Sequence, residues 1–134
     1  MRFMMLYKPG TESDPPPTQQ EMEDMGQFIQ EMAQSGALIA TDGLQPSSKG
    51  ARVRVADGKF TVTDGPFAET KELIAGYAIV EAKSKEEAIE LAKRFLNVVG
   101  KGESEIRLMH DAAAFDATCA QGFERAGEGQ GATR

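Results

Sequence analysis

Apolar residues recur at steps of three and four in two segments of the chain, a spacing that predicts two amphipathic helices. Each segment opens with a capping box, Thr18 with Glu21 and Ser84 with Glu87, in which both side chains satisfy free backbone N–H groups of the first turn. The apolar stripes consist of Met22, Met25, Ile29 and Met32 in the first segment, and of Ala88, Leu91, Ala92, Phe95 and Val99 in the second. We expect the helices to end at Gly36 and Gly100, since glycine favours helix termination.

Shorter apolar segments predict four strands, at residues 2–8, 37–44, 73–80 and 105–110. In the segments 2–8 and 73–80 the apolar side chains fall on both faces of the expected strand. Such a pattern is typical of strands that are covered on both sides.

A hairpin is predicted between the second and third of these strands. Arg52 and Arg54 alternate with valines, Asp57-Gly58 follows as a turn, and a second alternating run covers residues 59–62. Because one face carries the arginines, we expect the hairpin to be half solvated and to lie at the edge of the main sheet.

The order strand–helix–strand, hairpin, strand–helix–strand predicts an α+β fold, a ferredoxin-like split βαβ arrangement with an inserted hairpin. Right-handed crossovers place both helices on one face of the sheet. The other face would then be apolar and uncovered, which is more than a soluble monomer normally exposes. We therefore expect an isologous homodimer held by the sheet faces, with Met5 or Ile79 in the interface.

Composition limits the partners of the chain. It has 134 residues and a net charge of −6, so the sequence predicts one domain, residues 1–115, a mobile tail, residues 116–134, and no nucleic-acid partner. A single cysteine, Cys119, excludes an internal disulfide and fits a reducing compartment. The apolar stretch near the N-terminus is too short for a signal segment or a membrane span, so we expect a cytoplasmic protein without a membrane partner.

The segment 64–67 predicts a fixed turn. Gly65 can take a positive φ and Pro66 fixes the next φ, so the backbone reverses after Asp64, whose side chain can bond nearby backbone N–H groups. Phe67 is then either a plug over the sheet edge or the apolar wall of a pocket.

Charged residues follow this turn, with Glu69 and Glu72 on either side of Lys71. A carboxylate held near Phe67 in a partly dry pocket would have a raised pKa and could serve as a general base. The alternative is a solvated loop with a weak surface ion pair.

Few other residues suggest chemistry. His110 ends the last predicted strand and is either a strand-terminal residue bonded to backbone or a ligand or base. Tyr7 and Tyr77 could donate phenolic hydrogen bonds into a cleft, and Asp42 is a further acidic candidate. One histidine and one cysteine cannot form a tetrahedral metal site, and no phosphate-binding loop occurs, so we expect neither metal nor cofactor.

The motif DGPFAETKE at residues 64–72 resembles the signature of the YCII-related proteins of the DGPF type, and the resemblance extends over residues 1–110. It implies a small bacterial protein whose ferredoxin-like subunits pair into a dimeric α+β barrel. Some members use a His–Asp pair whose histidine stands early in the chain. Here no histidine precedes His110, which puts the transfer of that mechanism in doubt.

Two functions remain open from the sequence. The first is binding of a small molecule near the segment 64–72, in the regulatory setting beside a sigma factor that the resemblance implies. The second is a cofactor-independent lyase, isomerase or hydrolase with a carboxylate general base, for which Glu69, Glu72 and His110 are the candidates. In either case the expected ligand-binding residues are Asp64, Pro66, Phe67, Glu69, Lys71 and Tyr77.

Overall fold

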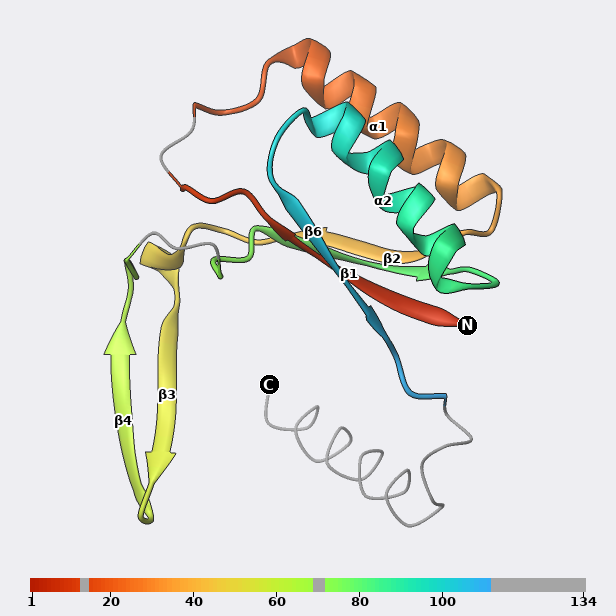
Figure 1. Cartoon of the computed structure of the whole chain (residues 1–134). Helices are drawn as coiled ribbons and strands as arrows, with labels where there is room; N and C mark the ends of the chain where they lie inside the picture. Colours follow the sequence, from red (N-terminus) through yellow and green to blue (C-terminus); the bar gives the residue numbers. More distant parts are fainter. Residues whose placement is uncertain (13–14, 69–71, 112–134) are drawn as a thin grey trace, which may run out of the picture.

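A four-stranded antiparallel sheet forms the base of the molecule (Figure 1). The computed structural model describes residues 1–12, 15–68 and 72–111. The strand order is β2-β5-β1-β6, with β1 at Arg2–Lys8, β2 at Leu38–Gly43, β5 at Gly76–Glu81 and β6 at Glu103–Leu108. This α+β topology is compatible with the ferredoxin-like arrangement that the sequence predicts.

Two helices, α1 at Gln19–Gln34 and α2 at Lys85–Val99, cover one face of this sheet (Figure 1). Both predicted N-caps are confirmed, because the hydroxyl of Thr18 accepts from the N–H of Glu21 and that of Ser84 from the N–H of Glu87, each at 3.1 Å. Gly100 ends α2 with a φ of 82°, a left-handed conformation that glycine adopts without strain. Neither helix of the described part is long and apolar enough to cross a bilayer.

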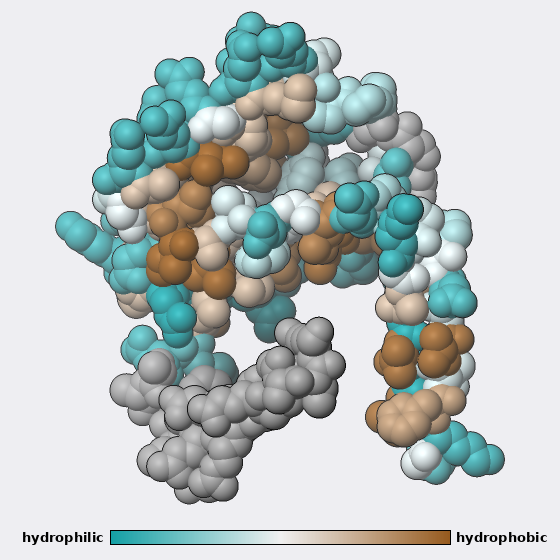
Figure 2. Space-filling view, turned by 180° about the vertical axis from the view of Figure 1, so that it is seen from behind, coloured by the Kyte–Doolittle hydropathy of each residue, from teal (hydrophilic) through white to brown (hydrophobic). Residues whose placement is uncertain are grey.

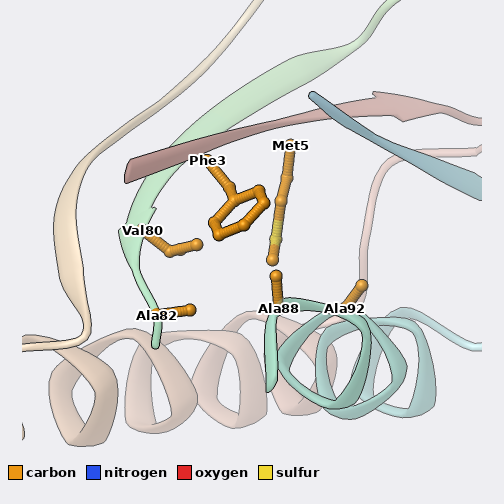
Figure 3. Close-up of a cluster of buried hydrophobic side chains, with 6 residues drawn as sticks. All are labelled: Phe3, Met5, Val80, Ala82, Ala88 and Ala92. Carbon is orange, nitrogen blue, oxygen red and sulfur yellow. The ribbon is translucent and has the colours of Figure 1, made fainter. Parts of the chain in front are cut away.

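The core lies between the sheet and α2. Figure 3 shows Phe3 and Met5 of β1 pointing from the sheet toward Ala88 and Ala92 of α2, with Val80 of β5 beside them. The two alanines are almost completely buried, and their small side chains let α2 approach the strands closely. In α1 only Met32 is buried, so this helix sits less tightly on the sheet.

The predicted hairpin forms, but it is neither half solvated nor part of the main sheet. Strands β3 (Ala51–Ala56) and β4 (Lys59–Asp64) make a separate two-stranded sheet, which follows a short 3₁₀ helix at Ser47–Lys49. Asp57 and Gly58 form the turn with φ values of 52° and 75°. Every residue of both strands is exposed, because the hairpin projects from the body and packs closely on no other described helix or strand (Figure 1).

Two strand boundaries differ from the sequence prediction. β5 begins at Gly76 and not at Leu73. Leu73 is buried, but it lies in the loop before the strand and is not paired in the sheet. β6 begins at Glu103 and ends at Leu108, before His110. The boundary expected at residues 115 and 116, the tail and Cys119 all lie outside the described residues.

The face of the sheet opposite the helices is uncovered within the described chain (Figure 1). Cross-strand register places Met4 beside Ile79 and Leu6 beside Tyr77 on this face. Met5 lies on the helix face, where it is only 7% exposed, so it cannot belong to an interface on the uncovered face. This corrects the sequence-based choice of Met5 and leaves Ile79 on the expected surface.

Candidate functional site

A cavity of about 610 Å³ lies between the helices and the sheet. Of the helix residues, only Met32 of α1 and Ala88 and Ala92 of α2 are buried, and both helices contribute other apolar side chains to the cavity. Figure 2 shows the corresponding hollow, with hydrophobic side chains gathered beneath the hydrophilic outer surface of the helices. Its walls include Met25, Phe28, Ile29 and Met32 of α1, and Leu91, Phe95 and Val99 of α2. A volume of this size is within the range of small-molecule sites.

The lining of the cavity is almost entirely apolar. The sheet contributes Met5, Leu38, Ala78 and Val80, and among the lining residues Asp42 is the single ionisable carboxylate. No lysine, arginine or histidine of the described chain lines the cavity. Such walls favour an uncharged molecule, because a charge placed there would lose its hydration without gaining a partner.

Three aromatic rings are part of the cavity lining. The rings of Tyr7 and Phe95 meet edge to face, with their centroids 5.3 Å apart and their planes at 85°. The phenol of Tyr7 donates to the carbonyl of Lys101 at 3.1 Å, which fixes the tyrosine ring against this wall. Phe28 supplies a third ring from α1, and its face is covered on one side by the guanidinium of Arg94 at 5.4 Å.

Tyr77, one of the predicted ligand-binding residues, borders the cavity together with Asp42. Register pairs Tyr77 with Leu6 on one side and with Asp42 on the other, so the side chains of all three share the uncovered face of the sheet. The two residues therefore border the cavity mainly through their backbone. The carbonyl of Tyr77 accepts from the hydroxyl of Thr41 at 2.9 Å.

The phenol of Tyr77 donates to Oδ2 of Asp42 at 3.1 Å. This hydrogen bond to the carboxylate raises the pKa of Tyr77, so the phenol keeps its proton at neutral pH. Asp42 and Tyr77 thus form a fixed carboxylate–phenol pair at the sheet.

The uncovered face of the sheet also carries a buried lysine. Lys8 is only 6% exposed, and its Nζ contacts Oε1 of Glu105 at 2.6 Å and Oε2 of Glu72 at 3.3 Å. The hydrogen bond to Glu105 raises the pKa of Lys8, and the same bond, with help from Arg107, lowers the pKa of Glu105. Glu105 therefore stays ionised and is poorly suited to accept a proton at neutral pH.

The backbone bends at Gly65, and glycine is needed there for a different reason from the one that the sequence suggested. Gly65 does not have a positive φ. A Cβ at this position would lie 1.6 Å from the carbonyl oxygen of Ser47, so glycine is needed because two backbone segments touch. The N–H of Gly65 also donates to the carbonyl of Gly50 at 3.0 Å.

Phe67 is fixed by contacts with the neighbouring loop rather than by the cavity. Its N–H donates to the hydroxyl of Ser47 at 3.0 Å, and the same hydroxyl donates to Glu12 at 2.6 Å. Its ring lies under the guanidinium of Arg52, 3.9 Å from the ring centroid. Asp64 and Pro66 are exposed, and neither they nor Phe67 line the cavity.

The remaining predicted site residues lie apart from the cavity or outside the described chain. Glu72 is an 80% exposed carboxylate paired with Lys8. His110 is exposed, and its backbone carbonyl accepts from Arg2 at 3.1 Å. Glu69 and Lys71 are among the residues that the structure does not describe. Within the described ranges, no group of three or more histidine, cysteine or acidic side chains is placed to hold a metal ion.

Sequence reasoning treated the cavity walls as ordinary core. Met25, Phe28 and Ile29 belong to the apolar stripe of α1, and a stripe alone does not show whether a helix packs tightly. One signal was available, because the second stripe has Ala88 and Ala92 for close approach, whereas the first has long methionines instead.

Comparisons with known proteins find related sequences. The profile of the YCII-related domain matches residues 1–109. A protein of Rhizobium meliloti (strain 1021), itself described as uncharacterized, is 32% identical over 87 residues, which are 64% of this chain and 70% of that protein.

A solved structure also superposes on the chain. It is a 5-chloro-2-hydroxyhydroquinone dehydrochlorinase from Burkholderia phenoliruptrix AC1100 in complex with 2,5-dihydroxybenzoquinone. The TM-score is 0.45 and the sequence identity 12%, over 87% of this chain and 100% of that chain.

Proposed function

The chain belongs to the YCII-related family, and we propose that this member binds an uncharged, largely apolar small molecule in the cavity between its helices and its sheet. The observation that carries the proposal is the cavity itself, with about 610 Å³ of space and walls of methionine, aromatic and aliphatic side chains. Unfilled apolar volume of this size destabilises a fold, because its walls lose dispersion contacts and hydrophobic burial. A bound ligand would restore both.

The lining also limits the chemistry of the ligand. Three rings, those of Tyr7, Phe28 and Phe95, favour a flat or aromatic molecule that stacks or meets them edge on. Methionines at the walls have flexible thioether chains that adapt to irregular shapes. Because the carboxylate of Asp42 is bonded to Tyr77 on the other face of the sheet, the walls favour a neutral ligand.

A pair of probes of equal shape tests this proposal. Naphthalenemethanol is neutral, whereas naphthoate carries a carboxylate on the same ring system. We expect calorimetry to show the neutral probe binding at least about tenfold more tightly, since the anion would be desolvated without a partner. Failure of every neutral ring compound to bind would overturn the proposal.

A matched pair of variants assigns binding to the cavity. Met25→Glu introduces a carboxylate into the wall and should weaken binding of the neutral probe by about tenfold or more. Met22→Glu makes the same change one turn earlier on α1, at an exposed position outside the cavity, and should leave the affinity unchanged. Phe67→Ala tests the binding site predicted at the segment 64–72. If this variant lost affinity for the neutral probe, the binding site would be at that segment and not in the cavity.

A homodimer joined by the uncovered sheet faces is part of the proposed architecture, and it would complete the dimeric α+β barrel that the sequence predicts. Met4, Leu6 and Ile79 supply an apolar centre, and this surface has no cover in the described chain. In a regulatory setting beside a sigma factor, occupancy of the cavity would be the signal that the protein reports.

The enzymatic alternative rests on one observation, the hydrogen-bonded pair of Asp42 and Tyr77. A cofactor-independent lyase, isomerase or hydrolase could use this carboxylate as a base and the protonated phenol as a donor toward a compound bound on the uncovered face of the sheet, outside the cavity. Asp42→Asn should then abolish turnover of a bound compound while its affinity persists. Under the binding proposal the variant has no such effect.

A further inference from the structure

We propose that the β3–β4 hairpin is an arm that clasps a second copy of this chain. Figure 1 shows the hairpin projecting from the body, on the side of the sheet away from α1 and α2. The inference rests on the proposed dimer and goes beyond it, because it assigns a second contact surface to a separate element.

One face of the arm is apolar except for Asp64 at its base, and all of its side chains are exposed. Register pairs Val53 with Val62 and Val55 with Phe60, so these four side chains share one face. Their exposed fractions are 66% for Val53, 63% for Val62, 60% for Val55 and 74% for Phe60. Figure 2 shows a hydrophobic patch on the projecting part of the molecule.

The opposite face is polar, since Arg52 is paired with Thr63 and Arg54 with Thr61. This separation is the alternation of a strand pair with one face buried and one face in water. A two-stranded hairpin that packs against nothing is marginally stable in water. The apolar face therefore requires a cover that the described residues of its own chain do not provide.

A second copy fits this requirement by position. The uncovered face of the sheet and the arm lie on the same side of the molecule, away from the helices (Figure 1). A copy that packs its own sheet on Met4, Leu6 and Ile79 therefore comes to lie beside the arm. A two-fold axis repeats every contact, so each arm would run along the flank of the other copy.

Charge supports the same occupant. The arm carries three cationic side chains, Arg52, Arg54 and Lys59, against two anionic ones, while the whole chain has a net charge of −6. A slightly basic arm on an acidic chain is attracted to another copy of that chain at long range.

Sedimentation equilibrium of the full chain tests the proposal with two double variants. Val55→Thr with Phe60→Thr removes apolar contact but keeps side chains of high strand propensity. It should raise the dimer dissociation constant about thirtyfold or more, as expected when a buried aromatic side chain is removed from an interface. Thr61→Ser with Thr63→Ser changes the polar face without altering its charge and should alter the constant by less than about threefold.

Hydrogen exchange provides a measurement that does not depend on a variant. Amides of the arm should be protected at high protein concentration and lose that protection on dilution below the dissociation constant. A wild-type monomer at micromolar concentration would overturn the dimer and the arm together. A different result would overturn the arm alone. In that case Ile79→Lys disrupts the dimer, the Val55/Phe60 double variant leaves the dissociation constant unchanged, and the arm amides stay protected on dilution. The cover of the arm would then come from its own chain.

Discussion

Gly65 illustrates how a residue can be constrained by a segment far from it in sequence. The dipeptide Gly65-Pro66 predicts a turn, and the backbone bends at Gly65. The reason for glycine, however, is the carbonyl of Ser47, which occupies the space of a side chain. Phe67 likewise depends on Arg52 and Ser47, two residues that no local pattern links to it. Contacts of this kind could not be predicted from the sequence, because they depend on how two loops meet in space.

Replacing Gly65 with alanine should destabilise the protein by about 1–3 kcal/mol, the usual cost of forcing an atom into filled space. The added Cβ would lie 1.6 Å from the oxygen and 2.5 Å from the carbon of the Ser47 carbonyl, so the backbone itself must move. Urea denaturation measures the loss of unfolding free energy.

Gly26→Ala is the matched control for this change. Gly26 lies within α1, and a Cβ added there would meet no atom within 4 Å beyond its own stretch of helix, so alanine should stabilise by about 0.5–1 kcal/mol. If Gly65→Ala were as stable as the wild type, the contact with Ser47 would be adjustable and the explanation wrong.

At the scale of elements, the helices were predicted more accurately than the strands. N-caps at Thr18 and Ser84 are local chemistry, and the structure confirms both hydroxyl caps, the first half of each predicted capping box. The start of β5 depends instead on pairing, since its first residue, Gly76, is placed opposite Tyr7 of β1. An apolar residue such as Leu73 can be buried in a loop as well as in a strand, so composition alone cannot locate the boundary.

Strands β1 and β6 are joined by a pH-dependent contact between Lys8 and Glu105. Because the pKa of Glu105 is lowered from its ordinary value of 4.5, the folded state binds this proton less tightly than the unfolded chain. The stabilisation is therefore complete above pH 4.5 and is lost as the pH falls through the folded-state pKa. Glu105→Gln should make the unfolding free energy depend less steeply on pH in the acid range, which we call the acid limb.

Urea titrations at a series of acidic pH values measure that limb. Lys8→Met should flatten much of the same limb, because the hydrogen bond from Lys8 is the largest cause of the lowered pKa of Glu105. An acid limb in both variants as steep as that of the wild type would show that the contact contributes nothing to folding.

For the whole molecule, the α+β class and the placement of both helices on one face followed from the sequence. The cavity did not, because its walls come from both helices and from the sheet, and no local pattern determines how these elements meet. The uncovered sheet face was expected, but assigning Met5 or Met4 to it required the register, since one residue of shift exchanges the two faces.

The proposed dimer predicts different outcomes for two lysine substitutions. Ile79→Lys, on the uncovered face, should give a folded monomer, because the charge would be buried without a partner only in the assembled interface. Met5→Lys should instead unfold the chain, since Met5 is 7% exposed within the core. Light scattering with circular dichroism separates mass from folding. A folded Ile79→Lys protein with the mass of the wild-type dimer would contradict the assignment of this interface.

The unequal seating of the two helices has a consequence for how the family can diversify. α2 is held by Ala88 and Ala92 against the sheet, so change there is constrained by the core. Met25, Phe28 and Ile29 of α1 border the cavity and are only partly buried. Substitutions at these positions would therefore change the shape of the cavity with little loss of unfolding free energy. Under the proposed function, selection for a new ligand would act first on α1, while Ala88 and Ala92 keep α2 on the sheet.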